Sequence, residues 1–319
     1  MVLPGLLSRG DIVRVIAPSS PFDPELLAQG IVVLRDRLGL EPRHRQDLFT
    51  RRRYLAGDDA RRLDEWREAV GDAQARAIFC ARGGYGLMRI LADIDPAPLV
   101  SSPKLLVGFS DVTALHAALN RAGLATVHGP VLTQLGRAPP EAVEHLASLL
   151  ARAPAPRPSG PLAPGAGLAG EAVLRAGRAE GPLLGGSLTL LAHLCGTPFL
   201  PSLEGAILAL EDVDERPYRL DRCLTQLRLA GALRGLAGVA LGQFTDCDGE
   251  GIRGLDVVRE WAAELGVPAV DGFPFGHVDS NLAFPLGARA LLVAPGPGEA
   301  GPPRLLFSGW SERAIPGPA

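Results

Sequence analysis

A serine that follows a short apolar run is the first candidate for chemistry in this sequence. The run Lys104–Gly108 ends in glycine, and Ser110 stands directly before a segment with helical spacing. Strand, sharp turn and helix in this order are typical of a nucleophile elbow, which exposes the serine oxygen. The backbone N–H of the next residue, Asp111, can then point at an oxyanion. Val112 stands where the motif has its second glycine, so a simple helix cap at Ser110 is the alternative.

A serine nucleophile needs a base, and the sequence offers six histidines. His116 and His193 fall in predicted helices, where a packing role is expected. His44 and His145 lie in charged stretches, where they are expected to be solvated. His128 ends an apolar run, whereas His277 lies in a polar loop framed by prolines, a setting that often carries catalytic groups. The residues alone leave His128 and His277 as nearly equal candidates.

The third member of such a site is a carboxylate, and an acidic cluster follows the apolar run at residues 206–210. Glu211 comes first after this run, so its position is the best fixed. Asp212, Asp214 and Glu215 are alternatives. The cluster lacks the spacing of a calcium loop and no HExxH pattern accompanies it, which argues against a metal site.

Two glycine-rich segments complete the candidates. Arg82–Gly86 lies between a predicted strand and a predicted helix, but it matches neither dinucleotide nor Walker loops. Its better use is to bring backbone N–H groups close to a substrate carbonyl or carboxylate. Ser187 follows two glycines and is a second possible nucleophile. No strand–Gly–x–Ser turn precedes it, so helix capping or substrate contact is the better explanation.

The elements that must position these residues alternate between strands and helices in the first half. The predicted strands are 11–17, 76–81 and 104–108, and the predicted helices are 24–38, 87–91 and 111–122. This alternation predicts a parallel sheet with helices on both faces. The carboxyl ends of its strands form the ligand crevice. The Pro18–Pro21 turn, the Arg82–Gly86 loop and the Ser110 turn should lie at that edge.

The chain of 319 residues is long for one core, so two domains are expected. Residues 1–152 would form an N-terminal α/β domain that carries Ser110. The proline-rich stretch 153–170 reads as a linker. Residues 171–319 would form a smaller, β-rich α/β domain that carries the glutamate and the histidine. Its predicted strands are 171–174, 206–210 and 238–242, and its predicted helices are 187–195, 218–230 and 256–265.

Composition excludes several classes of function. The net charge of −3 and the pI near 6.1 give no basic excess for nucleic acid. The N-terminus lacks the features of a secretory signal, and no apolar stretch is long enough to span a membrane. Four widely spaced cysteines argue against a structural zinc site and a disulfide framework. A cytoplasmic protein without metal, membrane or nucleic-acid partner is expected.

Taken together, these segments resemble the LD-carboxypeptidase family of serine peptidases, which also contains the microcin C immunity peptidases. The match runs from about residue 10 to 292, and the order of seven motifs makes it specific. The motifs are residues 10–21, Arg82–Gly86, 108–115, His128–Pro130, Gly185–Ser187, 210–213 with 217–222, and Gly276–His277 followed by Asn281 and 285–287.

The resemblance implies a catalytic triad of Ser110, Glu211 and His277, and it decides between His277 and His128. It also implies an oxyanion hole from the backbone of Asp111 and of a glycine in the Arg82–Gly86 loop, namely Gly84. The family fold is a flavodoxin-like N-terminal domain with a swivelling-type β-rich C-terminal domain, and the triad is assembled across the interface. Members are usually homodimers and require no cofactor or metal.

The family's typical substrate is the murein tetrapeptide of cytoplasmic cell-wall recycling, cut before its terminal D-alanine. Candidates for binding that substrate are Arg82, Gly83, Ser187 and Arg219, with the two arginines offered for its free carboxylate. The immunity branch instead cleaves a peptidyl-nucleotide antibiotic and stacks the base on an aromatic residue. Residues 151–181 contain no Trp, Tyr or Phe, which favours the murein substrate.

Overall fold

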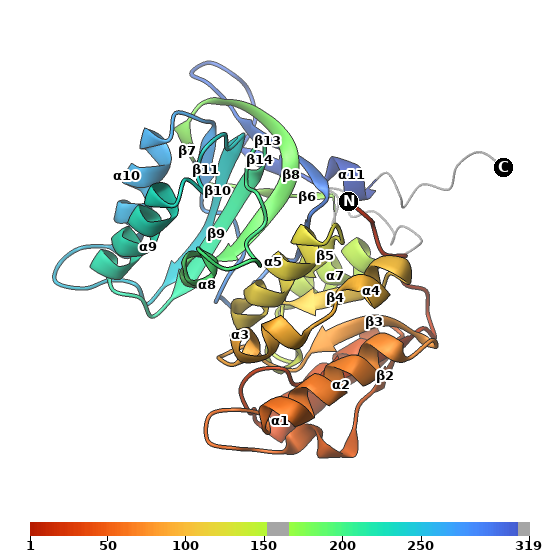
Figure 1. Ribbon diagram of the computed structural model, residues 1–319. Helices are drawn as coiled ribbons and strands as arrows, with labels where there is room; N and C mark the ends of the chain where they lie inside the picture. The colour runs from red at the N-terminus through yellow and green to blue at the C-terminus, as the bar shows by residue number, and fades with distance from the viewer. Residues whose placement is uncertain (152–165, 312–319) are drawn as a thin grey trace.

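The computed structural model describes residues 1–151 and 166–311. Figure 1 shows two α/β units, each built around one sheet, with α5 and α8 lying where the units meet. The first unit holds a largely parallel sheet and the second holds a β-rich sheet. This mixed α/β architecture is the one that the sequence predicts.

The first sheet has the strand order β12-β5-β4-β3-β1-β2. Strands β1 to β5 run parallel in the order 2-1-3-4-5 that is typical of flavodoxin-like folds. Strand β12 comes from the far end of the chain and pairs antiparallel with β5. The strands are β1 (Ile12–Ile16), β2 (Glu41–Arg43), β3 (Ala75–Cys80), β4 (Leu105–Gly108), β5 (Thr126–His128) and β12 (Phe284–Leu286).

Helices cover both faces of this sheet, which is why its central strands β1, β3 and β4 are mostly apolar, with Arg14 and Arg76 as their charged residues. On one face lie α1 (Pro24–Val32), its π-helical continuation Val33–Arg37, α6 (Leu132–Leu135) and α7 (Pro140–Leu150). On the other face lie α2 (Asp59–Gly71), α3 (Leu87–Ile90), α4 (Ala97–Ser101) and α5 (Thr113–Arg121). Short 3-10 turns occupy Gln46–Phe49, Leu91–Asp93 and Ser110–Val112.

The second sheet has the order β6-β14-β13-β8-β9-β10-β11-β7. Its centre, β8 to β11, is parallel, and the outer strands run antiparallel. Helices α8 (Leu188–Leu194), α9 (Pro217–Leu229) and α10 (Gly254–Glu264) pack on one face. The strands are β6 (Gly167–Ala169), β7 (Ala172–Arg175), β8 (Gly177–Ser187), β9 (Ile207–Val213), β10 (Gly238–Thr245), β11 (Ala269–Asp271), β13 (Arg289–Ala294) and β14 (Arg304–Leu306); the short helix α11 (Ser308–Ser311) ends the described chain.

The predicted linker 153–170 lies mostly outside the described residues. Its last part is not linker, because Gly167–Ala169 form β6 and pair with β14. The two units are also connected more closely than a linker implies. Strand β12 belongs to the first sheet, and one hydrophobic cluster contains residues of both units. None of the described helices is long and apolar enough to cross a bilayer.

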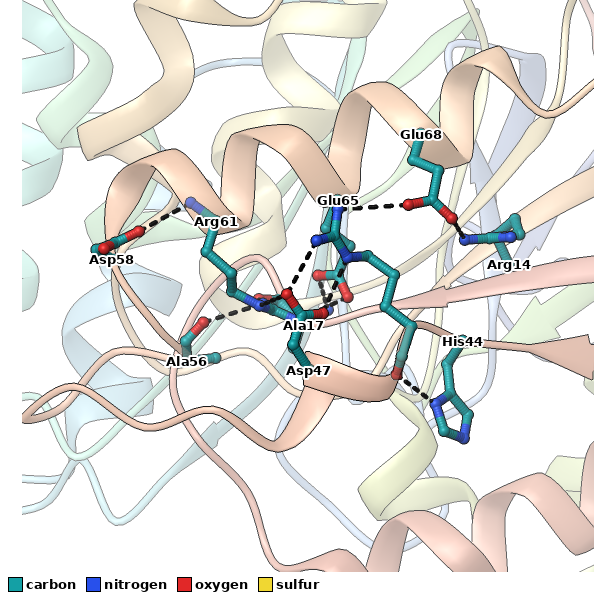
Figure 2. Close-up of polar contacts among 10 residues, drawn as sticks. Arg14, Ala17, His44, Asp47, Ala56, Asp58, Arg61, Glu65 and Glu68 are labelled. Carbon is teal, nitrogen blue, oxygen red and sulfur yellow. Dashed lines mark hydrogen bonds and ion pairs between the residues drawn. The ribbon is translucent and has the colours of Figure 1, made fainter.

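A buried carboxylate on α2 fixes the chain where it leaves β1 (Figure 2). Glu65 is 1% exposed and accepts the N–H of Ala17 at 2.7 Å and the guanidinium of Arg61 at 2.8 Å. Arg61 also donates to the carbonyl oxygens of Ala17 and Ala56. The network therefore fixes Ala17, which Figure 2 shows beside the helix and which directly precedes the Pro18–Pro21 turn.

Burial raises the pKa of Glu65 from 4.5 to about 7, although Arg61 and the Ala17 N–H oppose the rise. The native state therefore keeps a proton that the unfolded chain has already released between these pH values. We expect the free energy of unfolding to fall by up to roughly 3 kcal/mol as the pH rises through this window. Urea unfolding of the wild type and Glu65→Gln measures it, because glutamine does not titrate. A stability difference between the two proteins that is constant with pH would contradict the prediction.

Candidate active site

Ser110 lies in a sharp turn between β4 and α5. Phe109 is extended, and Ser110 has a φ of 65°, in the left-handed region that residues with a Cβ rarely adopt. Strain of this kind is characteristic of functional turns. The opposing chain is equally constrained, because a Cβ at Gly83 would lie 2.8 Å from the Ser110 Cβ. The strand–turn–helix geometry is that of a nucleophile elbow, with a glycine loop pressed against it.

His277 connects this serine to a carboxylate from the second unit. Its Nε2 lies 3.1 Å from Ser110 Oγ, and its Nδ1 lies 2.8 Å from Glu211 Oε2. The imidazole is partly accessible, with 22% of its side chain exposed, whereas Glu211 is fully buried. A histidine placed in this way can take the serine proton while the carboxylate holds its ring and stabilises its cation.

Glu211 is placed by the parallel pairing of β9 with β8, where it lies opposite Ser187. Its second oxygen, Oε1, has no hydrogen-bond partner in the described part of the chain. The next carboxylate, Asp212, accepts the N–H groups of Thr189 and Val213 instead. Burial raises the pKa of Asp212 to about 6, and the neighbouring Glu211 charge adds to the effect. Of the acidic cluster, Glu211 is the member hydrogen-bonded to His277.

The loop that carries His277 is held by Asn281, to which the sequence assigned no role of its own. Asn281 is 1% exposed, accepts the N–H of Gly276 at 3.0 Å and donates to Gln134 Oε1 at 3.2 Å. Phe109 packs on the imidazole, with the ring centres 4.7 Å apart. The bond from Gly276 to Asn281 is local to the loop, whereas the contacts with Gln134 and Phe109 join distant segments that no local pattern connects.

The Arg82–Gly86 loop runs beside the serine and is anchored to the Pro18–Pro21 turn. The N–H of Ser20 donates to the Gly83 carbonyl, and Ser20 Oγ accepts the N–H of Tyr85. The N–H groups of Gly84 and Asp111 donate no hydrogen bond to any described residue. Two unused donors beside a serine are what an oxyanion hole requires.

His128, the rival base, lies in the core. It is fully buried, stacks on Phe284 with ring centres 4.6 Å apart, and its two ring nitrogens have no partner among the described residues. Burial lowers its pKa well below 6.5. It therefore makes no hydrogen bond to Ser110, and its ring serves packing.

Two further histidines differ from their predicted settings. His145 is buried and bonded to the Ala283 carbonyl rather than solvated, because its helix α7 turns this side towards the core. His193 is exposed on α8 rather than packed. His116 is buried as predicted, with Nε2 on the Gly108 carbonyl at 2.8 Å.

The predicted substrate-binding residues differ in how they lie relative to Ser110, His277 and Glu211. Arg82 is exposed on the glycine loop and donates to the Pro21 carbonyl. The Ser187 hydroxyl accepts the N–H of Leu190 and so caps α8. Arg219 is half exposed on α9 and pairs with Glu215 at 3.6 Å. Neither the Ser187 hydroxyl nor Arg219 hydrogen-bonds a member of the Ser110–His277–Glu211 chain.

Comparison with known proteins gives matches along most of the chain. Residues 13–129 match the model of the LD-carboxypeptidase N-terminal domain, and residues 180–292 match that of the C-terminal domain. The murein tetrapeptide carboxypeptidase of Pseudomonas aeruginosa is 38% identical over 288 residues, 88% of this chain and 92% of that protein. A Bacillus subtilis protein named probable murein peptide carboxypeptidase is 37% identical over 312 residues, 91% of each.

A solved structure supports the same assignment of fold. The muramoyltetrapeptide carboxypeptidase of Oxalobacter formigenes superimposes with a TM-score of 0.79 at 30% identity, covering 92% of this chain and 97% of that one. The microcin C7 self-immunity protein of Escherichia coli is more distant, at 27% identity over 262 residues, 74% of this chain and 76% of that protein.

Proposed function

Because the chain belongs to the LD-carboxypeptidase family, we propose that it is a serine-type carboxypeptidase acting on murein tetrapeptide. It cleaves the L,D-peptide bond that precedes the terminal D-alanine. The observation that carries the mechanism is the hydrogen-bonded chain from Ser110 through His277 to Glu211. The two relatives named for murein peptides support the substrate.

In the proposed mechanism, His277 takes the proton of Ser110 as its oxygen attacks the carbonyl carbon of the L,D bond. Glu211 keeps the Nδ1 proton in place and stabilises the imidazolium that forms. His277 then gives its proton to the amine of the leaving D-alanine. Water, deprotonated by the same histidine, hydrolyses the acyl-enzyme and restores Ser110.

The backbone N–H groups of Asp111 and Gly84 are the proposed oxyanion donors. A single donor of this kind contributes on the order of 3 kcal/mol to transition-state stabilisation. For the free carboxylate of D-alanine we propose Arg82, because it lies next to Gly83, which contacts the Ser110 turn. Arg219 already contacts Glu215 and the Tyr218 hydroxyl, so we rank it second as a candidate for binding this carboxylate.

We further propose that the protein works in the cytoplasm as a homodimer, and that residues 1–152 and 171–319 act as two domains. The family resemblance supports these proposals, and the crossing strand β12 qualifies the domain boundary. Light scattering of the purified protein measures the subunit number, and a monomer at enzymatic concentrations would contradict the dimer.

A second candidate is hydrolysis of an aminoacyl-nucleotide antibiotic, which the match to the microcin C7 self-immunity protein favours. The lower identity and the lack of Trp, Tyr and Phe in residues 151–181 make it the weaker proposal.

Mass spectrometry of purified murein tetrapeptide after incubation with the protein tests the proposal. We expect loss of one alanine from the peptide that ends in D-alanine and none from its diastereomer that ends in L-alanine. A Ser110→Ala protein purified in parallel controls for contaminating peptidases. An untouched tetrapeptide, together with hydrolysis of an aspartyl sulfamoyl adenosine analogue, would move the assignment to the second candidate.

A further inference from the structure

The proposed mechanism uses the backbone of Asp111 and leaves its side chain unexplained. The carboxylate is 2% exposed, and Oδ2 accepts the N–H of Leu87 at 2.9 Å. On the other side, Arg62 of α2 is fully buried, and its Nη1 donates to the Gly86 carbonyl at 2.8 Å. The Gly86 carbonyl and the Leu87 N–H belong to one peptide group. This peptide is therefore bound at both polar ends by buried, oppositely ionisable side chains.

Burying both ionisable side chains costs free energy unless hydrogen-bond partners compensate for the lost water. A buried ionic group is stable only where partners satisfy it. Burial raises the pKa of Asp111, while the Ser19 hydroxyl, the N–H groups of Leu87 and Gly86, and the charge of Arg62 oppose this. Arg62 donates to Asp59 at 2.5 Å and to the carbonyls of Pro18 and Gly86, whereas its Nε has no hydrogen-bond partner among the described residues. The positive group meets the carbonyl end of the peptide and the acidic group meets its N–H end, so the two contacts align with the peptide dipole.

The clamped peptide closes the glycine loop beside the serine. It lies two residues after Gly84, and the loop is also anchored by two hydrogen bonds with Ser20 and by the contact of Arg82 with the Pro21 carbonyl. Asp111 directly follows Ser110 in the chain, so its carboxylate ties this loop to the serine turn itself. The glycine loop and the serine turn are in close contact, because even a Cβ at Gly83 would collide with Ser110.

We propose that Arg62 and Asp111 form a peptide clamp whose role is to hold the N–H of Gly84 in register with Ser110. They are positioning residues, which act through the glycine loop and touch no reacting atom with their side chains. The proposal rests on the proposed function for the identity of the oxyanion hole, although not for the identity of the substrate.

The test compares Arg62→Met, Arg62→Lys, Asp111→Ala and the double variant Arg62→Met/Asp111→Ala. We expect kcat for D-alanine release to fall by about 10- to 100-fold in the Met and Ala variants, since an oxyanion donor is displaced. Substrate affinity, measured by calorimetry in the Ser110→Ala background, should change little. The double variant should be no worse than the poorer single variant, because both contacts hold one peptide. Arg62→Lys can still reach one carbonyl and should recover part of kcat.

Arg67→Met is the matched control. Arg67 lies on the same helix and pairs with Asp64 three residues earlier, as Arg62 pairs with Asp59, but its side chain is 60% exposed. It should leave kcat unchanged. The rate of labelling by a serine-directed phosphonate gives a readout that needs no particular peptide, since the phosphonyl oxygen also occupies the oxyanion hole.

If the wild type is labelled by the phosphonate but does not cleave the tetrapeptide, the proposed substrate is rejected. The labelling rates of the variants then test the clamp by themselves. The clamp itself is rejected if folded Arg62→Met and Asp111→Ala proteins keep wild-type kcat and labelling rates. It is also rejected if their losses are additive, or appear in substrate affinity instead of kcat. Should Arg62→Met fail to fold, the comparison of Arg62→Lys with Asp111→Ala decides by the same criteria.

Discussion

Replacing His277 with alanine is expected to lower kcat for D-alanine release by about 10⁴- to 10⁶-fold. The imidazole lies within hydrogen-bond reach of Ser110 Oγ, at 3.1 Å, and in the proposed mechanism it acts as the base and also protonates the leaving amine. Its loss removes both proton transfers, whereas binding of the tetrapeptide should be retained. Steady-state assays of released D-alanine, with calorimetric binding, separate the two quantities.

His128→Phe is the control for this prediction. A phenyl ring can keep the stack on Phe284, and the ring nitrogens that it removes have no hydrogen-bond partner among the described residues. Activity should stay within a few-fold of the wild type. If His128→Phe were inactive while folded, and His277→Ala fully active, the assignment of the base would be reversed.

Glu211→Gln is expected to lower kcat by about 10³- to 10⁴-fold with little change in KM. The amide has the same shape, but its NH2 group can donate to His277 Nδ1 and so favour the tautomer that protonates Nε2. That tautomer cannot accept the proton of Ser110. In the proposed mechanism the carboxylate also stabilises the imidazolium, since it lies 2.8 Å from Nδ1 and is fully buried.

Asp212→Asn tests whether this effect is specific. Asp212 is the next residue and is also buried, but it binds backbone N–H groups at the start of α8 instead of His277. Its replacement should change kcat by less than about tenfold, since the remaining carbonyl oxygen can still accept a hydrogen bond. Equal losses in the two variants would show that general disturbance of β9, and not the contact with His277, lowers the activity.

Local patterns in the sequence predicted the elements that lie next to the serine. The apolar run before Ser110 became β4, and the predicted strands 11–17 and 76–81 became β1 and β3. These strands are buried on both faces, so their composition alone identifies them. Strand β2 escaped prediction because it is a short edge strand with charged residues. Strand β8 escaped prediction because six of its eleven residues are glycine or charged, as its sequence GRAEGPLLGGS shows.

The site itself depends on contacts between distant segments, which no local pattern contains. Ser110, Glu211 and His277 approach one another only because β8 and β9 bring the second unit against the start of α5. The two units are in close contact at Gly186, which has a φ of 132°. A Cβ at this position would lie 2.5 Å from Thr113 Oγ1 at the start of α5. Residue types and local setting left His128 and His277 undecided, and the family resemblance was needed to choose.

Because strand β12 belongs to the first sheet, this sheet can be completed only after residues 284–286 have been synthesised. Residues 284–286 form the edge of the sheet that carries the nucleophile, and they follow His277 by only a few positions. A nascent chain on the ribosome thus lacks the last strand of its first sheet until residue 286 has been translated. Prematurely terminated products would expose the edge of β5, a pairing surface that favours aggregation and proteolytic clearance.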